Sequence, residues 1–550
     1  MGAPSETPDM EERVAQLLAP FAGEVCTADL LCDGHDPEHT AYHIVAADGS
    51  CETLTYGELK RQSELRAAVL ASLGVGAGDR VATLMGKSRE LLCVLVGIWR
   101  LGAVHVPLFT AFAPAAIALR LSGSDAKVVV CDESQEAKLD ASDDIPADAP
   151  WRVITTGSGE RGNLSLSSLL SRDLPTVART VRGGDDPLIH IYTSGTTGEP
   201  KGVVVPIRAL ATFRAYGEFG YDLRPGDVFC NAADPGWAYG LYCGILASLT
   251  SDTPSVMLEG GFDAARTYDV LKRLGVTNFA AAPTVYRSLA SSDVPVPAGL
   301  ALRCLSSAGE PLTPDINEWA QREFGLLVHD HYGQTEMGMF INNHHHPQLR
   351  RPVRTGSMGH PMPGWCAVVL AEDRDEPAMP GEVGRVAIDL SQSPFSYFTG
   401  YHGQAEKSAE KFSPDGRLYF TGDVGHVDED GYVFFSSRDD DIIMMAGYRI
   451  GPFEVESVVC AHPDVVESAA IAVPDPIRGE VMECYVVLRS GVKGSPALAA
   501  EIQQLVKTRY AAHAYPRVVH FVDAMPKTPS GKIQRVVLKQ RRRAELVSVS

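Results

Sequence analysis

Apolar and polar residues alternate between helical and strand periods over residues 55–131. Thr55 and Glu58 form a capping box, in which each side chain can satisfy an unpaired backbone amide at the start of a helix. Gly74 is suited to end that helix, because glycine readily adopts the backbone conformation of a helix C-terminus. The pattern then predicts strands at 81–85, 104–108 and 127–131, and helices at 90–101 and 114–121. Strands that alternate with helices favour a mostly parallel sheet covered by helices.

The rest of the chain divides into regions of different character. Residues 132–187 are rich in Asp, Ser, Pro and Gly, which predicts an irregular surface segment, and the strand–helix alternation resumes at residue 188. A turn-rich stretch at 371–384 is followed by a smaller β unit with strands near 385–390 and 432–435. After a break near 436–441, the pattern predicts helices at 453–461 and 497–510 and strands at 468–473 and 484–488. This last segment can form an α+β domain of its own.

Length and charge narrow the class of protein. The chain has 550 residues, of which 45% are hydrophobic and 21% charged, so we expect a globular protein with two or more domains. Its net charge of −20 argues against binding to nucleic acid or anionic membranes, but it allows small anions held by local donors. The longest apolar run, 92–109, is interrupted by Arg100 and His105, which predicts a buried helix and strand and no integral membrane segment.

The cysteines predict a cytoplasmic protein. There are 11, an odd number, and no pair has the CxxC spacing of a zinc or redox site, so a thiol-reduced compartment fits better than a disulfide framework. The N-terminal residues have no basic region followed by an apolar core, and we therefore expect no signal peptide.

The strongest chemical signal is a loop at 193–202 that follows an apolar strand. Glycines can turn backbone amides toward an anion, hydroxyls add donors and lysine adds charge, which are the requirements of a polyphosphate. The spacing is not that of a Walker A loop, and residues 86–88, which resemble its end, lack its first glycine. The predicted phosphate-binding residues are Thr193, Ser194, Gly195, Thr196, Thr197, Gly198 and Lys201.

This loop resembles the phosphate loop of the acyl-adenylate-forming (AMP-binding) superfamily, which includes acyl-CoA synthetases, amino-acid adenylation domains and luciferases. Four further segments are similar to motifs of that family in the same order, at 332–336, 419–423, 438–449 and 526–532. The resemblance implies a large N-terminal multi-subdomain α/β domain at 1–437, a hinge at 438–440 centred on Asp440, and a small mobile C-terminal α+β domain at 441–550. It also implies that Gly447 lines a CoA channel.

The resemblance implies a role for each motif residue. Glu336 corresponds to the Mg²⁺ ligand, Asp423 and Arg438 to the ribose contacts, and Arg449 to a phosphate contact. Lys532 corresponds to the catalytic lysine that bridges the substrate carboxylate and the α-phosphate of ATP, where two anions meet. The adenine contacts implied in the same way are Gly309, Glu310, Pro311, Asp330, His331, Tyr332, Gln334 and Thr335.

The acyl pocket is implied by a segment at 234–240 that resembles acetyl- and medium-chain acyl-CoA synthetases. The residues that border it are Trp237, Ala238, Tyr239, Ala308 and Gly333. The acetyl enzymes carry a tryptophan at the position of Gly333, which closes their pocket. Removing an indole leaves room, and filling apolar room favours larger acids by ~0.8 kcal/mol per buried methylene. We therefore expect a medium-chain, branched, aromatic or polycyclic acid in preference to acetate.

The expected reaction is an ATP-dependent acid–thiol ligation, with ATP, Mg²⁺ and coenzyme A, that passes through an acyl-AMP and releases pyrophosphate and AMP. One alternative is an acyl-adenylate ligase that loads a carrier protein, and a second is a non-catalytic nucleotide-binding scaffold. The sequence leaves the oligomeric state open. The triplet at 344–346 is predicted to be a surface or active-site loop and not a metal site, because adjacent side chains point in different directions. The basic residues Lys539 and Arg541–Arg543 are expected to be solvated, with contact to the CoA phosphates as the alternative.

Overall fold

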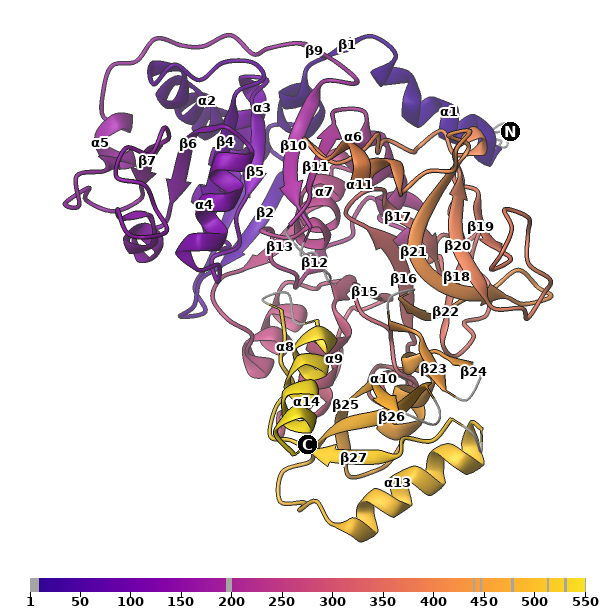
Figure 1. Ribbon diagram of the computed structural model, residues 1–550. Coiled ribbons are helices and arrows are strands. Elements are labelled where there is room, and N and C mark those ends of the chain that lie inside the picture. The colour runs from indigo at the N-terminus through magenta and orange to yellow at the C-terminus, as the bar shows by residue number, and fades with distance from the viewer. Residues whose placement is uncertain are drawn as a thin grey trace.

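The computed structural model describes residues 9–193, 200–438, 441–445, 448–475, 479–511, 514–528 and 532–549 (Figure 1). One half of the predicted capping box is confirmed at helix α2 (Tyr56–Ser72), where the Thr55 hydroxyl accepts a hydrogen bond from the Glu58 amide at 3.2 Å, while the Glu58 carboxylate pairs with Arg89. Gly74 follows the helix with a φ of +83°, a conformation that favours glycine. The buried helix and strand expected from the long apolar run are α3 (Arg89–Arg100) and β5 (Val104–Pro107).

A first sheet has seven strands in the order β11-β10-β5-β4-β6-β7-β8 and is mostly parallel. Helices α2, α3 and α4 (Pro114–Gly123) lie around it in Figure 1. The remaining strands are β4 (Arg80–Leu84), β6 (Ala126–Cys131), β7 (Arg152–Thr155), β8 (Leu164–Ser165), β10 (Pro187–Tyr192) and β11 (Gly202–Pro206).

The expectation that 132–187 is irregular is wrong in part. Strands β7 and β8 extend the first sheet from within this segment, and helix α5 (Leu166–Leu170) follows them. Both strands are short and are flanked by polar residues, so their hydrophobic pattern is weak. Pairing with β6 nevertheless buries Ile154 completely, because the neighbouring strand and helices supply the apolar partners.

A second, longer run of strands joins the centre of the molecule to a β unit on its right in Figure 1. Its order is β19-β20-β21-β22-β18-β17-β16-β15-β14-β12-β13-β2-β3. The parallel part is β2 (Thr40–Val45), β12 (Phe229–Asn231), β13 (Ser255–Leu258), β14 (Asn278–Ala281), β15 (Cys304–Ala308) and β16 (Val328–Gln334), with β3 (Cys51–Thr55) antiparallel at its edge. The antiparallel part is β17 (Gly338–Asn342), β18 (Ser357–Pro361), β19 (Ala367–Leu370), β20 (Gly384–Asp389), β21 (Leu418–Val427) and β22 (Val433–Arg438).

Helices and a short strand pair complete the large part of the chain. The helices are α1 (Met10–Leu18), α6 (Ala209–Ala215), α7 (Ala247–Thr250), α8 (Ala264–Arg273), α9 (Pro283–Ala290), α10 (Pro314–Phe324) and α11 (Ala405–Ala409). The strand pair is β1 (Glu24–Val25) with β9 (Arg182–Gly183). Among the described residues, no helix combines the length and apolar character that a membrane crossing requires. All eleven cysteines are free, as their spacing predicted.

The C-terminal segment forms a separate five-stranded sheet with its own hydrophobic core, drawn in orange and yellow in Figure 1. Its strands are β23 (Ile443–Met445), β24 (Tyr448–Ile450), β25 (Val465–Asp475), β26 (Gly479–Leu488) and β27 (Val518–Phe521), and its helices are α12 (Pro452–Cys460), α13 (Pro496–Arg509) and α14 (Arg535–Val549). Helix α12 packs against β22 of the large part, where the Phe435 and Phe453 rings lie 6.1 Å apart. This contact brings the C-terminal sheet beside the strands that carry the ribose motif.

Candidate functional site

The predicted phosphate loop joins the two strands of a β-hairpin. β10 and β11 pair antiparallel with Tyr192 opposite Gly202, and the Thr193 amide donates to the Lys201 carbonyl at 2.9 Å. The Lys201 ammonium group lies 4.8 Å from the centre of the Tyr401 ring. The predicted phosphate-binding residues between them, Ser194, Gly195, Thr196, Thr197 and Gly198, lie outside the described residues.

Three predicted nucleotide-binding residues converge on the carboxylate of Asp423. The Tyr332 hydroxyl and the Gln334 amide both donate to Oδ2, the latter at 2.7 Å. Arg438 lies opposite Asp423 in the β21–β22 ladder and places Nη1 3.2 Å from Oδ1. Asp423 is only 4% exposed, so these donors hold a largely dehydrated anion in one orientation. A carboxylate fixed in this way can accept further hydrogen bonds from the two hydroxyls of a ribose.

Glu336 is held by a residue that the sequence did not indicate. The Tyr401 hydroxyl donates to Oε1 of Glu336 at 2.8 Å, and the same ring carries Lys201 on its face. Among the described residues, Oε2 accepts no hydrogen bond, so the carboxylate retains an oxygen for a cation. This fits Mg²⁺, which binds through one or two carboxylates together with phosphate oxygens. Tyr401 belongs to none of the five motifs, and no local pattern marks it.

Lys532 is within electrostatic range of these carboxylates. Its amide donates to the Thr528 hydroxyl at 3.1 Å. The residue is exposed, yet partial dehydration lowers the pKa of its ammonium group. Glu310, Asp423 and Glu336 act on the same group and oppose the shift, while Arg438 adds to it. The carboxylates of the large part of the chain thus act on the C-terminal lysine.

Three other predicted residues lie wholly or partly outside the described part of the chain. Asp440 and Gly447 lie outside the described residues. Arg449 is in β24, where its main chain pairs with Met444, and its side chain is also outside the described part.

The predicted adenine contacts lie at the ends of β15 and β16. Gly309 directly follows Ala308 with a φ of +96°, and Glu310 accepts hydrogen bonds from Thr284 at 2.9 Å and from Arg287 at 2.9 Å. Pro311 continues the segment. The Thr335 carbonyl accepts a hydrogen bond from the Tyr242 hydroxyl at 3.3 Å.

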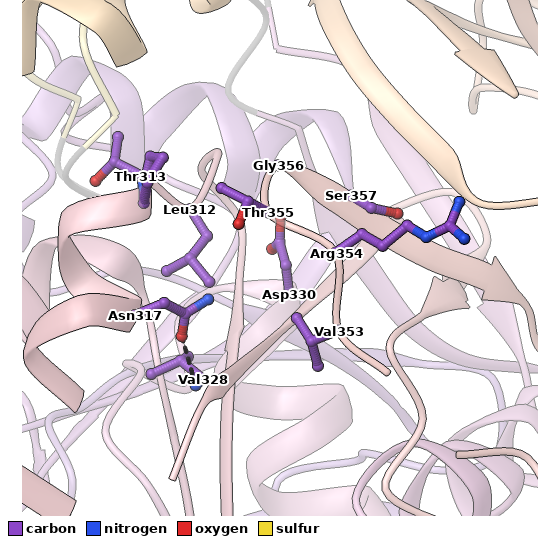
Figure 2. Close-up of a pocket in the computed structure, with 11 residues that line it drawn as sticks. Leu312, Thr313, Asn317, Val328, Asp330, Val353, Arg354, Thr355, Gly356 and Ser357 are labelled. Carbon is purple, nitrogen blue, oxygen red and sulfur yellow. Dashed lines mark hydrogen bonds between the residues drawn. The ribbon is translucent and has the colours of Figure 1, made fainter. Parts of the chain in front are cut away.

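A narrow pocket opens beside this segment (Figure 2). Figure 2 shows Asp330 between Leu312–Thr313 on one side and Val353–Ser357 on the other. The cavity volume is about 10 Å³, which is close to the space of one ordered water. Burial raises the pKa of Asp330 well above its usual range, although the amides of Leu312 and His331 favour its ionised form. The pocket thus offers a polar wall next to the predicted adenine position.

The histidine triplet differs from its prediction, because two of its members are buried. His345 stacks on His329 with the rings 3.7 Å apart, and His331 lies beside them. The ring nitrogens that face the carbonyls of Asn343 and Leu305 must carry hydrogen, since a carbonyl can only accept. Burial lowers the pKa of His329 to about 4 and holds the pKa values of His331 and His345 well below the usual range. The cluster is therefore a neutral hydrogen-bonded network that supports β16. Its three potential ligand atoms lie within 4.8 Å of one another, but the ring nitrogens that donate to carbonyls are occupied.

Two of the five residues predicted to border the acyl group are aromatic. Trp237 packs against Phe109 and Phe112, with ring centroids 5.4 Å and 5.6 Å apart. Tyr239 accepts a hydrogen bond from the Tyr221 hydroxyl at 3.2 Å. The other three, Ala238, Ala308 and Gly333, carry at most a methyl group.

Contrary to the prediction, the structure leaves no open room on the Cβ side of Gly333. A Cβ on Gly333 would lie 2.1 Å from the Gly338 carbonyl oxygen and 2.7 Å from Sδ of Met339. The cause is a bulge between Tyr332 and Gly333, which brings the β17 backbone against this position. Glycine is thus required by close packing of β16 on β17, and any acyl space must lie on another side of Gly333.

We expect Gly333→Ala to destabilise the chain and not to change its acid preference. Overpacking at a buried backbone contact lowers the free energy of unfolding by about 1–3 kcal/mol. Because β16 carries both Tyr332 and Gln334, kcat/KM should fall by a similar factor for every acid. Thermal unfolding and kinetics with a short and a bulky acid would measure both effects. Gly261→Ala is the control, since nothing lies within 4 Å of its Cβ position. A selective loss of bulky acids would contradict this interpretation.

Comparison with known proteins assigns these features to one family. A model described as AMP-binding enzyme matches residues 33–402, and one described as AMP-binding enzyme C-terminal domain matches residues 454–532. The chain belongs to the AMP-binding enzyme family. The first match covers most of the large part of the chain, and the second covers strands β25, β26 and β27 of the small C-terminal sheet.

Individual relatives resemble this AMP-binding enzyme over most of their length. An acetyl-coenzyme A synthetase of Bacillus subtilis (strain 168) is 36% identical over 500 residues, which covers 89% of this chain and 85% of the relative. The crystal structure of an acyl-CoA synthetase from Brucella canis is 40% identical, with a TM-score of 0.74 and coverage of 98% and 99%. A benzoate CoA ligase from Burkholderia xenovorans LB400 is 28% identical, with a TM-score of 0.81 and coverage of 96% and 99%.

This AMP-binding enzyme is an AMP-forming acyl-CoA synthetase. Enzymes of this kind use ATP, Mg²⁺ and coenzyme A, and the expected fold of a large N-terminal domain with a small C-terminal domain is confirmed. Mg²⁺ supplies charge neutralisation at the phosphates, for which Glu336 is the fitting ligand.

Proposed function

We propose that the chain activates a carboxylic acid larger than acetate, of the medium-chain, branched, aromatic or polycyclic class, and transfers it to coenzyme A. Support comes from the small side chains at two of the five predicted border positions, Ala238 and Ala308. Neither position carries a bulky side chain of the acetyl-enzyme type. The benzoate CoA ligase shows that the same fold serves an aromatic acid in a relative.

The proposed site residues bind different parts of ATP and of the reacting acid. Asp423 and Arg438 fix the ribose, Glu336 holds Mg²⁺, and Lys532 lies between the acid and the α-phosphate. The carboxylate oxygen forms a bond to the α-phosphorus while the bond from that phosphorus to the bridging oxygen breaks, and the electron pair leaves with pyrophosphate. The single observation that carries this assignment is the convergence of Tyr332, Gln334 and Arg438 on the carboxylate of Asp423, whose charge, like that of Glu336, acts on the Lys532 ammonium group. The Thr193–Lys201 loop and Arg449 are proposed to hold the phosphates.

The second half-reaction is proposed to require rotation of residues 441–550 about Asp440. Coenzyme A sulfur then attacks the acyl carbonyl, and the bond to the AMP oxygen breaks. Gly447 is proposed to line the channel of the thiol, because a thin ligand needs a wall without a Cβ. A cytoplasmic location belongs to the same proposal. The alternative acceptor is a carrier-protein thiol.

The test of acid class is pyrophosphate release measured against acetate, octanoate, benzoate and bulky alicyclic acids, each with and without coenzyme A. We expect a larger kcat/KM for at least one bulky acid than for acetate, and sustained turnover only with coenzyme A. A larger kcat/KM for acetate than for all the others would refute the acid class. Pyrophosphate release that is indifferent to coenzyme A would favour the carrier-protein acceptor.

A further inference from the structure

Lys411 lies next to the ribose and metal carboxylates but belongs to none of the five motifs. It stands between α11 and β21, and its Nζ donates to the carbonyl oxygens of Phe420 and Thr421, both at 3.0 Å. An ammonium group has three N–H donors, and the third has no partner among the described residues. The lysine is thus fixed by two bonds to β21 and retains one donor for a ligand.

Lys411 is within electrostatic range of both functional carboxylates. Burial lowers the pKa of its ammonium group, Glu336 and Asp423 oppose this shift, and Arg438 and Lys201 add to it. Its bond to the Thr421 carbonyl places it beside the part of β21 that carries Asp423. A polyphosphate whose ribose is bound at Asp423 therefore comes near Lys411.

Two cations meet at a point kept free by a glycine. A Cβ on Gly422 would lie 3.4 Å from Nζ of Lys411 and 3.6 Å from Nη2 of Arg438. Gly422 has a φ of +78°, so its backbone also disfavours any side chain there. Arg438 is partly neutralised by Asp423, and an anion that lies between it and Lys411 would offset the remaining repulsion of the two cations.

The charged side chains around Lys411 favour such an anion. Lys532 and Lys201 share this neighbourhood with Lys411 and Arg438. Of the carboxylates that act on Lys532, Glu310 is already paired with Arg287 at 2.9 Å. Among the described residues, Lys201, Lys411, Arg438 and Lys532 then outnumber Asp423, Glu336 and Glu410, and this excess of positive charge raises the local concentration of anionic ligands.

We propose that Lys411 binds the β-phosphate of ATP and retains the pyrophosphate leaving group. This inference rests on the proposed function, because only adenylation creates pyrophosphate at this place. Lys411 transfers no proton: the α-phosphorus gains the acid oxygen and loses the bridging oxygen, and the ammonium group stabilises the charge that collects on that oxygen. Since β21 carries Asp423 and the carbonyls that hold Lys411, ribose and pyrophosphate are bound by one rigid strand.

The test compares binding of AMP, ATP and inorganic pyrophosphate, each with Mg²⁺, to the full chain and to Lys411→Met. Methionine preserves the length of the side chain and removes the charge. We expect ATP and pyrophosphate to bind about 10-fold or more weakly, the usual effect of losing one charge-assisted hydrogen bond, while AMP binds within about 2-fold of the unmodified chain. Lys411→Arg should recover most of the loss. The control is Lys272→Met, an exposed lysine in the last turn of α8.

Each other result overturns the inference. Equal weakening of AMP and ATP would make Lys411 a structural support of β21, and unchanged pyrophosphate affinity would exclude a phosphate contact. Pyrophosphate release by the unmodified chain with its best acid tests the proposed function separately from the role of Lys411. If the unmodified chain binds neither ATP nor pyrophosphate, the proposed function fails as well; if it binds both and Lys411→Met is unchanged, only the role of Lys411 fails.

Discussion

Lys532→Ala should lower the rate of acyl-adenylate formation by roughly 10²–10³-fold, the usual effect of removing one preorganised charge that stabilises a transition state. The charges of Glu310, Asp423 and Glu336 act on its ammonium group, which supports the proposal that this positive charge lies where the acid and the α-phosphate meet. Formation of the thioester from supplied acyl-adenylate should largely survive, because we propose that this step follows a rotation of the C-terminal domain that carries Lys532 away. Single-turnover measurement of each half-reaction separates the two effects.

The pH dependence gives Lys532 a signature that a structural role does not share. Its pKa is lowered by partial dehydration, and only the protonated form carries the useful charge. The kcat/KM for ATP, which reports the free enzyme, should therefore fall as pH rises through a pKa lower than that of an ordinary lysine. Lys532→Arg cannot lose its proton in this range, so its alkaline limb should disappear although its rate is lower.

The control for both measurements is Lys493→Ala, an exposed lysine in the same C-terminal domain. Its half-reaction rates should equal those of the unmodified chain. If Lys532→Ala changed neither half-reaction, or slowed both equally, the assigned role of Lys532 would be wrong.

Local patterns predicted much of the fold because their signals are contained in a few neighbouring residues. The capping box at Thr55 and Glu58 needs only one helical turn, and the apolar run at 92–109 needs only its own length to be identified as a buried helix and strand. Local patterns did not predict strands β7 and β8. A two-residue strand such as β8 has no period of its own, and it forms because β7 offers an edge to pair with.

The candidate site divides in the same way. Asp423 and Arg438 were found separately by resemblance, and the β21–β22 register then places them opposite each other. Tyr401 and Lys411 could not be found, because each owes its position to partners that are distant in sequence or lie on another strand. The space assigned to Gly333 failed for a related reason: the β17 backbone that fills it is placed by a bulge, and the sequence carries no mark of that bulge.

Asp423→Asn should weaken ATP binding by roughly 10–100-fold and lower the free energy of unfolding by about 2–3 kcal/mol. The amide preserves the shape of the side chain but presents an NH₂ group to at least one of the donors that now converge there, from Tyr332, Gln334 and Arg438. The carboxylate is 4% exposed, so water cannot replace the lost acceptor. Calorimetric titration with ATP and urea unfolding measure the two effects.

A graded pair of variants distinguishes ribose binding from support of the strand. Tyr332→Phe removes one donor and leaves the charge, so its effect on ATP affinity should be smaller than that of Asp423→Asn. Asp148→Asn, at an exposed loop position, should change neither quantity. If Asp423→Asn unfolds more easily yet binds ATP within 2-fold of the unmodified chain, the carboxylate only stabilises the junction of β16, β21 and β22. If the loss in free energy of ATP binding exceeds the loss in free energy of unfolding, the carboxylate contacts the nucleotide. A contact with the ligand contributes nothing to the unfolding of the free chain.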